Sequence, residues 1–224
     1  MKIYGHPWSI NTRKSLMTLA ETGHRAKLVL VMIPKGEQKQ PDHVARHPFG
    51  KVPVLDDGEV RLFETRAINA YLARKSAPAL VGRRDIEQAL VDQWVNVADS
   101  YFVPHAHALI VETVFRPYLG GERDENTIAN SRDGMQRALD VANDRLADAP
   151  FLAGEPFTIA DIHWMPYFEY LVQTGQGDNV RSRKHLSAWW DRVCARESWQ
   201  RVARSGPQPY EPGMTAELVE KQYR

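Results

Sequence analysis

The residues best suited to catalysis or ligand binding lie near the start of the chain, between a short apolar run and a helical pattern. The sequence there is Gly5-His6-Pro7-Trp8-Ser9-Ile10-Asn11-Thr12-Arg13. Ser and Asn at a helix start commonly cap unpaired backbone N–H groups, which is the simpler interpretation. Alternatively, a hydroxyl is aimed at a bound anion that the positive helix end also favours. A thiolate gains most from such a site, because a thiol pKa of ~8.5 lies close to neutrality.

A second motif, Val52-Pro53, precedes an apolar run. It is consistent with a sharp turn ahead of an edge strand. The alternative is a cis bond that presents the backbone N–H and C=O of Val52 to a ligand. Strand-like pairing with a bound peptide would then follow.

A third motif, Phe63-Glu64-Thr65-Arg66-Ala67-Ile68, lies where an apolar run meets the next helical pattern. Glu64 and Thr65 either cap that helix or contact a ligand. In the ligand interpretation, the hydroxyl and N–H of Thr65 hold a carboxylate and Glu64 holds an ammonium group.

A fourth motif, Thr158-Ile159-Ala160-Asp161, is a capping box with Asp in place of Glu, flanked by Phe157 and Ile162 as a hydrophobic staple. We interpret it as structural, the start of the core helix of a second domain. The histidines give no metal pattern, because two that are two residues apart point to different faces of a helix. No metal site is expected.

The elements that must position these motifs change in kind near residues 76–84. Before that point, we expect a strand at 2–4, a helix at 11–22 that ends at Gly23, and a buried strand at 26–33. This order favours a parallel strand pair with a helical crossover. The Asp-Gly pair at 57–58 predicts a hairpin between 52–55 and 60–62, followed by a helix at 65–75.

After that point almost all of the chain has helical patterns. We expect a long helix over 85–115 with a kink at Pro104, a helix over 125–146 weakened by Gly134, and a helix from Thr158. Two further helices are expected at 185–196 and 199–204. Three prolines predict an extended segment at 206–213.

Length and composition limit the class of protein. The 224 residues favour two domains, and the balance of 29 Lys plus Arg against 28 Asp plus Glu argues against a nucleic-acid binder. The single cysteine, Cys194, excludes an internal disulfide and a CxxC redox pair. The apolar run at 28–33 is too short to span a membrane, and no secretory signal is recognised at the start. We expect a soluble cytoplasmic protein.

Taken together, these motifs resemble the glutathione transferase family, nearest to the plant phi class and related bacterial enzymes. The resemblance rests on Gly5-His6-Pro7-Trp8-Ser9, on residues 35–39, 47–53 and 62–68, and on the capping box at 158–161. The sequence departs from the family pattern at Gln38, Lys51 and Thr65, where the family has His, Gln and Ser. Thr65 keeps the hydroxyl, Lys51 can still reach a carboxylate, and Gln38 keeps a neutral donor.

The resemblance implies an α/β thioredoxin-like N-terminal domain (1–77), an all-α C-terminal domain (85–205) and a tail (206–224). It implies glutathione as co-substrate and Ser9 as the catalytic residue, with Asn11 as second candidate. The implied glutathione contacts are Trp8, Ser9, Gln38, Lys39, Lys51, Val52, Glu64 and Thr65. Candidate walls for an electrophile pocket are Trp8, Tyr101, His105, Phe115, Tyr118 and Trp164. It also implies a homodimer, with Phe49 inserted as an aromatic key into the partner, and neither a nucleic-acid nor a membrane partner.

Three functions compete. The first is transfer of the glutathione thiolate to an electrophilic, mostly apolar small molecule, with a hydrogen bond from Ser9 to the thiolate. The second is glutathione-dependent reduction of disulfides or peroxides, suggested by Asn11 two residues beyond Ser9. The third is a non-catalytic glutathione-binding module on the same fold, since fold does not fix function. The joint presence of Ser9, Lys51 and Glu64 counts against the third.

Overall fold

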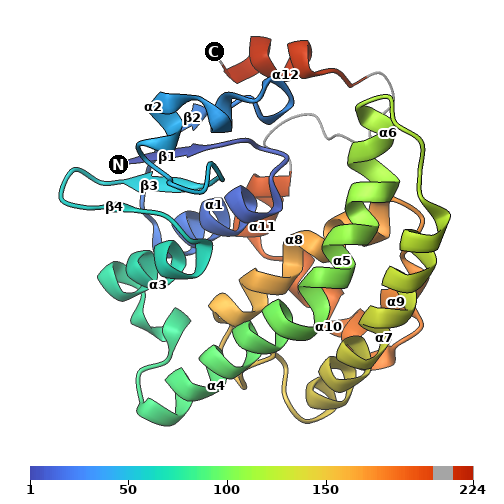
Figure 1. Cartoon of the computed structure of the whole chain (residues 1–224). Coiled ribbons are helices and arrows are strands. Elements are labelled where there is room, and N and C mark those ends of the chain that lie inside the picture. The colour runs from blue at the N-terminus through green and yellow to red at the C-terminus, as the bar shows by residue number, and fades with distance from the viewer. Residues whose placement is uncertain (204–213, 224) are drawn as a thin grey trace. The chain divides into compact units, whose positions relative to one another are not determined.

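The computed structural model describes residues 1–203 and 214–223. The chain divides into two compact units, which we describe separately. The first comprises Met1–Ala77 together with Glu197–Arg224, and the second is Pro78–Arg196. Figure 1 labels their helices and strands along the chain.

A mixed sheet forms the centre of the first unit. Within the described residues it has four strands in the order β2-β1-β3-β4. β1 pairs in parallel with β2 and antiparallel with β3, and β3 pairs antiparallel with β4. The strand–helix–strand unit and the Asp-Gly hairpin are therefore confirmed. The strands are β1 (Lys2–Gly5), β2 (Lys27–Leu30), β3 (Val54–Asp56) and β4 (Arg61–Leu62).

The second strand is shorter and less buried than the sequence predicts. β2 ends at Leu30 and none of its residues is fully buried, because it forms one edge of the sheet. The chain then enters two 3-10 turns, Ile33–Lys35 and Glu37–Lys39, separated by Gly36 at a positive φ of 73°. Pro34 and Gly36 explain why the β-branched run does not continue as a strand.

Helices pack on this sheet around an apolar core made by Ile3, Leu19, Leu55, Ile68 and Leu72. A buried hydrogen bond of 3.0 Å from the Ser15 hydroxyl to the Asn69 side-chain oxygen joins α1 to α3. The helices of this unit are α1 (Ile10–Thr22), α2 (Pro41–Val44), α3 (Thr65–Ser76), α11 (Glu197–Ala203) and α12 (Ala216–Tyr223).

The boundaries differ from the expected domains at the C-terminal end. α11 groups with the first unit, whereas the sequence assigns residues 199–204 to the helical domain. The hydroxyl of Ser198 in α11 donates a hydrogen bond to the carboxylate of Glu21 in α1. The expected extended segment at 206–213 lies outside the described residues, and the end of the expected tail forms α12.

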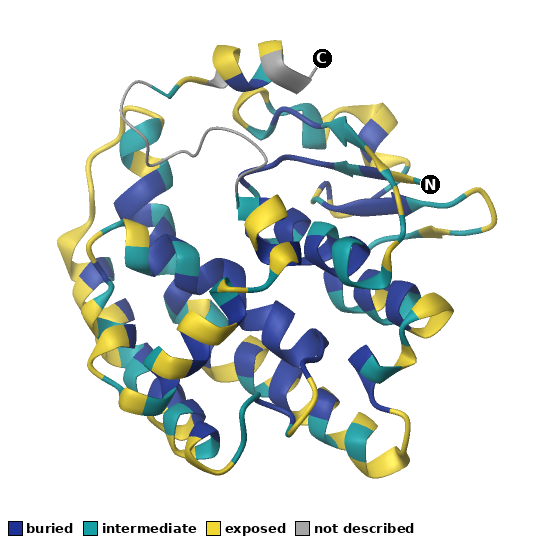
Figure 2. Ribbon diagram, turned by 180° about the vertical axis from the view of Figure 1, so that it is seen from behind, coloured by how far each residue is buried: buried dark blue, intermediate teal, exposed yellow. Residues whose placement is uncertain are grey.

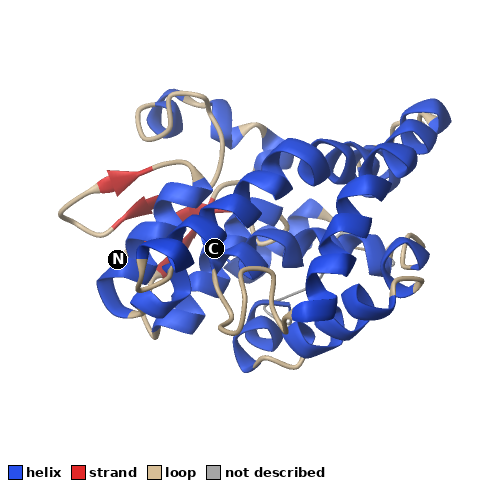
Figure 3. Ribbon diagram, turned by 90° about the horizontal axis from the view of Figure 1, so that it is seen from below, coloured by secondary structure: helices blue, strands red, loops and turns tan. Residues whose placement is uncertain are grey.

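The described residues of the second unit are helical and lack strands, apart from an isolated bridge between Phe151 and Gly154 (Figure 3). Its centre is aromatic: Trp164 stacks on Phe102 at 4.6 Å, and Phe168 lies edge-on to Trp189 at 5.1 Å. The inward helix faces are correspondingly buried (Figure 2). The helices are α4 (Asp85–Val97), α5 (Val103–Ile110), α6 (Arg116–Tyr118), α7 (Glu125–Asp148), α8 (Ile159–Gln173), α9 (Asp178–Arg181) and α10 (Lys184–Cys194).

The long helix expected over 85–115 is interrupted twice by π-helical turns, at Ala98–Phe102 and Val111–Phe115. Each is followed two residues later by a proline, Pro104 or Pro117. A proline has no N–H and its ring clashes with the carbonyl four residues earlier, so a wider turn ahead of it relieves both problems. The kink expected at Pro104 thus takes the form of a π-turn.

The capping box at the start of α8 is confirmed. The Thr158 hydroxyl accepts a hydrogen bond from the Ala160 N–H at 3.2 Å, and the Asp161 carboxylate accepts from the Thr158 N–H at 3.0 Å. No described helix is long and apolar enough to cross a membrane. The described residues also contain no group of three or more His, Cys, Asp or Glu that could hold a metal ion.

Candidate functional site

The sheet register brings the sequence motifs to one end of the first unit. β1 pairs antiparallel with β3, so the residues after Gly5 lie beside those before Val54. β4 returns antiparallel to β3, so the segment after Leu62 reaches the same end. β2 runs parallel to β1, so the segment after Leu30 emerges there as well. Segments 6–13, 31–39, 47–53 and 63–65 therefore share one end of the sheet.

Ser9 is the N-cap of α1. Its backbone is extended (φ −68°, ψ 121°), and its side-chain oxygen accepts a hydrogen bond from the Thr12 N–H at 3.3 Å. A hydroxyl has two acceptor lone pairs and one donor hydrogen. The cap uses a lone pair, so the hydrogen can still donate to an anion at the helix start.

The neighbours of Ser9 are fixed by close packing. Asn11 is already inside α1, so it is not the helix cap. Thr12 is fully buried against Gly5, where an added Cβ would lie 2.6 Å from the Thr12 side chain. Only glycine therefore allows the end of β1 to approach α1 this closely.

His6 is a buried neutral imidazole that shapes the loop before Ser9. Its Nδ1 accepts a hydrogen bond from the Trp8 N–H at 3.2 Å, and its ring lies edge-on to the Trp8 ring at 5.2 Å. Burial, helped by the charge of Arg13, lowers the pKa of His6 from 6.5 to about 4. The Arg13 side chain in turn donates from Nε to the Pro7 carbonyl at 2.9 Å.

Two further loops are packed on each other. The Lys39 ammonium donates to the Phe49 carbonyl at 3.1 Å. Gly50 has a positive φ of 57°, and an added Cβ would lie 2.8 Å from the Gln38 carbonyl oxygen. The His43 Nε2 lies 2.7 Å from the Lys51 carbonyl oxygen. Gln38, Lys39 and Lys51 therefore come from touching loops, and the two lysines give these loops their positive charge.

Glu64 is the one described non-glycine residue with a positive φ, at 68°. Such a conformation costs energy and collects at functional sites. Glu64 precedes α3, but among the described residues its side chain makes no capping hydrogen bond. The geometry thus disfavours the capping interpretation, and Thr65 at the first position of α3 is nearly buried.

The Val52–Pro53 bond is cis. Val52 is half-buried and directly precedes the buried Pro53 and Val54, where β3 begins. The cis bond is the geometry expected if Val52 presents its backbone N–H and C=O to a ligand.

The residues expected to form walls of an electrophile pocket differ in how far they are exposed within their own units. Trp164 has no exposed surface, since it stacks on Phe102 and donates from Nε1 to the Trp94 carbonyl at 3.2 Å. It therefore offers no wall to a ligand here, and Trp8 is also buried, at 2% exposure. Phe115 is half-buried against the Tyr170 ring, and Tyr118 is half-buried.

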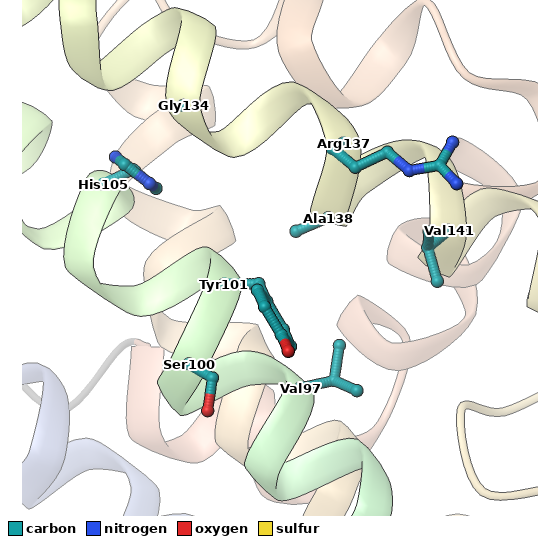
Figure 4. Close-up of a pocket in the computed structure, with 8 residues that line it drawn as sticks. All are labelled: Val97, Ser100, Tyr101, His105, Gly134, Arg137, Ala138 and Val141. Atoms are coloured by element: carbon teal, nitrogen blue, oxygen red, sulfur yellow. The ribbon is translucent and has the colours of Figure 1, made fainter.

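Tyr101 and His105 line a separate pocket of about 340 Å³ within the second unit. Figure 4 shows both side chains on one helical segment, facing α7. The sequence did not predict that α7 lines one side of this pocket. Gly134 was its one signal: an added Cβ there would lie 2.3 Å from the His105 ring, so the mid-helix glycine admits that ring. The pocket is lined by Val97, Ser100, Tyr101, His105, Gly134, Arg137, Ala138 and Val141.

Comparison with known proteins matches both units. Residues 1–74 match the family model for the glutathione S-transferase N-terminal domain, and residues 102–197 match that for the C-terminal domain. Glutathione S-transferase F10 of Arabidopsis thaliana is 38% identical over 201 residues, which is 88% of this chain and 94% of that protein. Glutathione S-transferase 4 of Zea mays is 38% identical over 208 residues, 92% of this chain and 93% of that protein.

Solved structures with a similar fold are also glutathione transferases. Glutathione transferase F2 from Populus trichocarpa has a TM-score of 0.87 at 35% identity, covering 92% of this chain and 99% of that one. Glutathione S-transferase I from maize, in complex with an atrazine glutathione conjugate, has a TM-score of 0.86 at 31% identity, covering 95% and 99%.

The small mixed sheet with Ser9 at the start of α1, followed by a helical unit, defines a thioredoxin-like domain joined to an all-α domain. The chain belongs to the glutathione S-transferase family. The expected family and fold class are thereby confirmed.

Proposed function

We propose that this protein conjugates the thiolate of glutathione to electrophilic, mostly apolar small molecules. The observation that carries the proposal is the Ser9 hydroxyl, which caps α1 through its oxygen and keeps a hydrogen to donate. In the reaction the glutathione thiol releases its proton to water, and a sulfur lone pair forms a bond to the electrophilic carbon. In a substitution, the leaving group departs with its electron pair; in an addition, the π-bond electrons move away from the attacked carbon and are then protonated from water.

Ser9 acts on the first of these steps. A hydrogen bond to a charged group is worth roughly 1.5–3 kcal/mol, which lowers a thiol pKa by about 1–2. That is enough to populate the thiolate near neutral pH. Holding the thiolate beside the electrophile supplies further rate through proximity.

The remaining contacts bind the peptide. Lys39 and Lys51 offer cations to one carboxylate, and Thr65 with the N–H groups at the start of α3 receives the other. Glu64 holds the ammonium group, and Val52 pairs its backbone with the peptide. Gln38 completes the set, whereas the buried Trp8 packs against His6 and supports the loop that carries Ser9.

This assignment predicts a particular kinetic effect. Lys51→Ala and Glu64→Ala should raise the KM for glutathione more than they lower kcat, because they contact parts of the peptide remote from the sulfur. Glu59→Ala, an exposed change on the β3–β4 hairpin turn at the other end of the sheet, is the control and should leave both constants unchanged. Loss of turnover at unchanged glutathione affinity would contradict the assignment.

We also propose that the protein is a homodimer in which Phe49 enters the pocket of about 340 Å³ in a second copy. Phe49 touches the rings of His47 and Phe63 and yet is 67% exposed. This role for the pocket takes Tyr101 and His105 away from the electrophile. Phe115 and Tyr118 remain as candidate walls of the electrophile site. A cytoplasmic location fits the single cysteine, since thiols stay reduced there.

A further inference from the structure

The C-terminal helix of the first unit contacts the edge strand β2 of its sheet. α12 packs on β2 (Figure 1). Val219, in the middle of α12, has no exposed surface, and the Glu220 carboxylate forms an ion pair with the Lys35 ammonium. Among the described side chains of α12, Val219 is buried and Glu220 is paired with Lys35.

The position of α12 has a physical reason. β2 is an edge strand, and an unpaired edge invites pairing with other chains unless something covers it. The residues of β2 are only half-buried or exposed even with α12 in place. A helix on this strand therefore shields apolar surface that the rest of the sheet leaves open.

The ion pair between Glu220 and Lys35 involves a segment that also belongs to the proposed glutathione site. Lys35 ends the first 3-10 turn after β2, and Gln38 and Lys39, two of the proposed glutathione contacts, lie in the next turn. The Glu37 carboxylate between them accepts a hydrogen bond from the Met32 N–H at 2.7 Å. The segment 32–40 is thus held from within by Glu37 and from outside by Glu220.

We propose that α12 is a strap that positions segment 32–40 for glutathione, with Val219 and Glu220 as positioning residues. This inference rests on the proposed function, because that function is what makes Gln38 and Lys39 glutathione contacts. It adds that the affinity for glutathione depends on a helix almost two hundred residues away in sequence.

The ion pair gives the first test. Glu220→Lys and Lys35→Glu should each raise the KM for glutathione by a factor of about two to five, the range that an exposed ion pair supports, with kcat unchanged. The double variant Lys35→Glu/Glu220→Lys restores the pair with reversed sign and should return KM toward its original value. Glu59→Lys is the matched charge-reversal control and should leave KM unchanged.

The apolar contact gives the second test, which does not depend on turnover. Val219→Asp places a charge in a buried position, so α12 should leave β2. Hydrogen exchange of the amides of Met32, Lys39 and Gln40, which are hydrogen-bonded within this segment, should become at least about tenfold faster, while that of Ile3 and Leu55 stays slow. The KM for glutathione should rise in the same variant.

The outcomes separate the two proposals. If the unaltered protein fails to conjugate glutathione, the proposed function fails, while the exchange experiment still tests the strap. Unchanged exchange in Val219→Asp would overturn the strap. Faster exchange with unchanged glutathione affinity would also overturn it, because α12 would then only cover the strand edge. A double charge swap that fails to restore KM would overturn the role of the ion pair.

Discussion

At the scale of the residue, the Ser9 side chain combines two roles that the sequence presents as alternatives. Its oxygen accepts the Thr12 N–H, which satisfies one of the unpaired donors at the start of α1. Its hydrogen is left to stabilise an anion. Capping therefore does not compete with catalysis, and one substitution should damage both stability and chemistry.

Ser9→Ala should lower kcat and raise the kinetic pKa of the bound thiol by about 1–2, following the strength of a charged hydrogen bond. It should also lower the free energy of unfolding by about 1 kcal/mol through loss of the cap. Ser9→Thr keeps the hydroxyl and should keep most of both properties. Turnover against pH at saturating glutathione, with urea unfolding alongside, measures the two effects.

Asn11 is the comparison for this prediction. It lies inside α1 and is not the cap, so the loss of stability from removing the cap belongs to Ser9→Ala. Asn11→Ala should leave the kinetic pKa nearly unchanged. A pKa that moves in Asn11→Ala and stays constant in Ser9→Ala would transfer the catalytic role to Asn11 and favour disulfide reduction.

His6 predicts how stability depends on pH. Burial holds its pKa at about 4 in the folded chain, against 6.5 ordinarily, so the unfolded chain binds more protons between these values. Its contribution to stability is complete above pH 6.5 and is lost as pH falls to about 4, with a slope of up to ~1.36 kcal/mol per pH unit. His6→Asn keeps an acceptor for the Trp8 N–H and should flatten this slope. Urea unfolding from pH 4 to 7 measures it, and equal slopes would contradict the assignment.

At the scale of the element, Asp161 joins three parts of the second unit. Its buried carboxylate accepts hydrogen bonds from the Leu152 N–H at 3.0 Å and the Trp189 Nε1–H at 2.9 Å, in addition to both donors of Thr158. Burial raises the pKa of Asp161, and these donors oppose the rise. The capping box is therefore also the link from the start of α8 to α10 and to the loop before α8.

Asp161→Ala should lower the free energy of unfolding by about 3–5 kcal/mol, because it leaves several buried donors unsatisfied. Thr158→Ala removes the cap and one of the four hydrogen bonds to Asp161 but leaves the other three donors satisfied, so it should cost less, about 1–2 kcal/mol. Urea unfolding of both variants tests the difference. Equal costs would mean that Asp161 acts only as a helix cap.

Elements encoded by local signals could be predicted from the sequence. Asp57-Gly58 identifies the hairpin, and Thr158 with Asp161 identifies the start of α8, because turns and caps depend on a few neighbouring residues. The half-buried state of β2 and the covering helix α12 could not be predicted, since both depend on contacts between segments distant in sequence. The π-turns before Pro104 and Pro117 were expected only as a kink at one of them.

In the candidate site, too, some features could be predicted from the sequence and others could not. Ser9, Lys51 and Glu64 follow from motifs, and the sheet register explains why their segments lie at the same end of the sheet. The positive φ of Glu64 is a property of the folded backbone that its side-chain type does not announce. The sequence cannot distinguish a pocket wall from a core position at Trp164, because an aromatic residue in a helical pattern is suited to either, and its side chain is buried in the core of the second unit.

At the scale of the whole molecule, the second unit carries a pocket and the first unit carries an exposed ring that could fill one. In a dimer with twofold symmetry, each Phe49 would enter the pocket of the other copy, so two rings are buried in each dimer. Large aromatic side chains in pockets are the residues that dominate interface energies. Gly134 leaves room for the His105 ring, and both residues line this pocket together with Tyr101, Ala138 and Val141.

Phe49→Ala should therefore shift the dimer toward monomer. At about 2 kcal/mol for each ring, loss of both corresponds to a dissociation constant about a thousandfold higher. Sedimentation over a dilution series measures that constant directly. Leu119→Ala is the matched control, because Leu119 is also 67% exposed but does not line the pocket, and it should leave the dimer intact. If Phe49→Ala and Leu119→Ala dissociate at the same concentration as the unaltered protein, Phe49 packs only against His47 and Phe63 of its own chain.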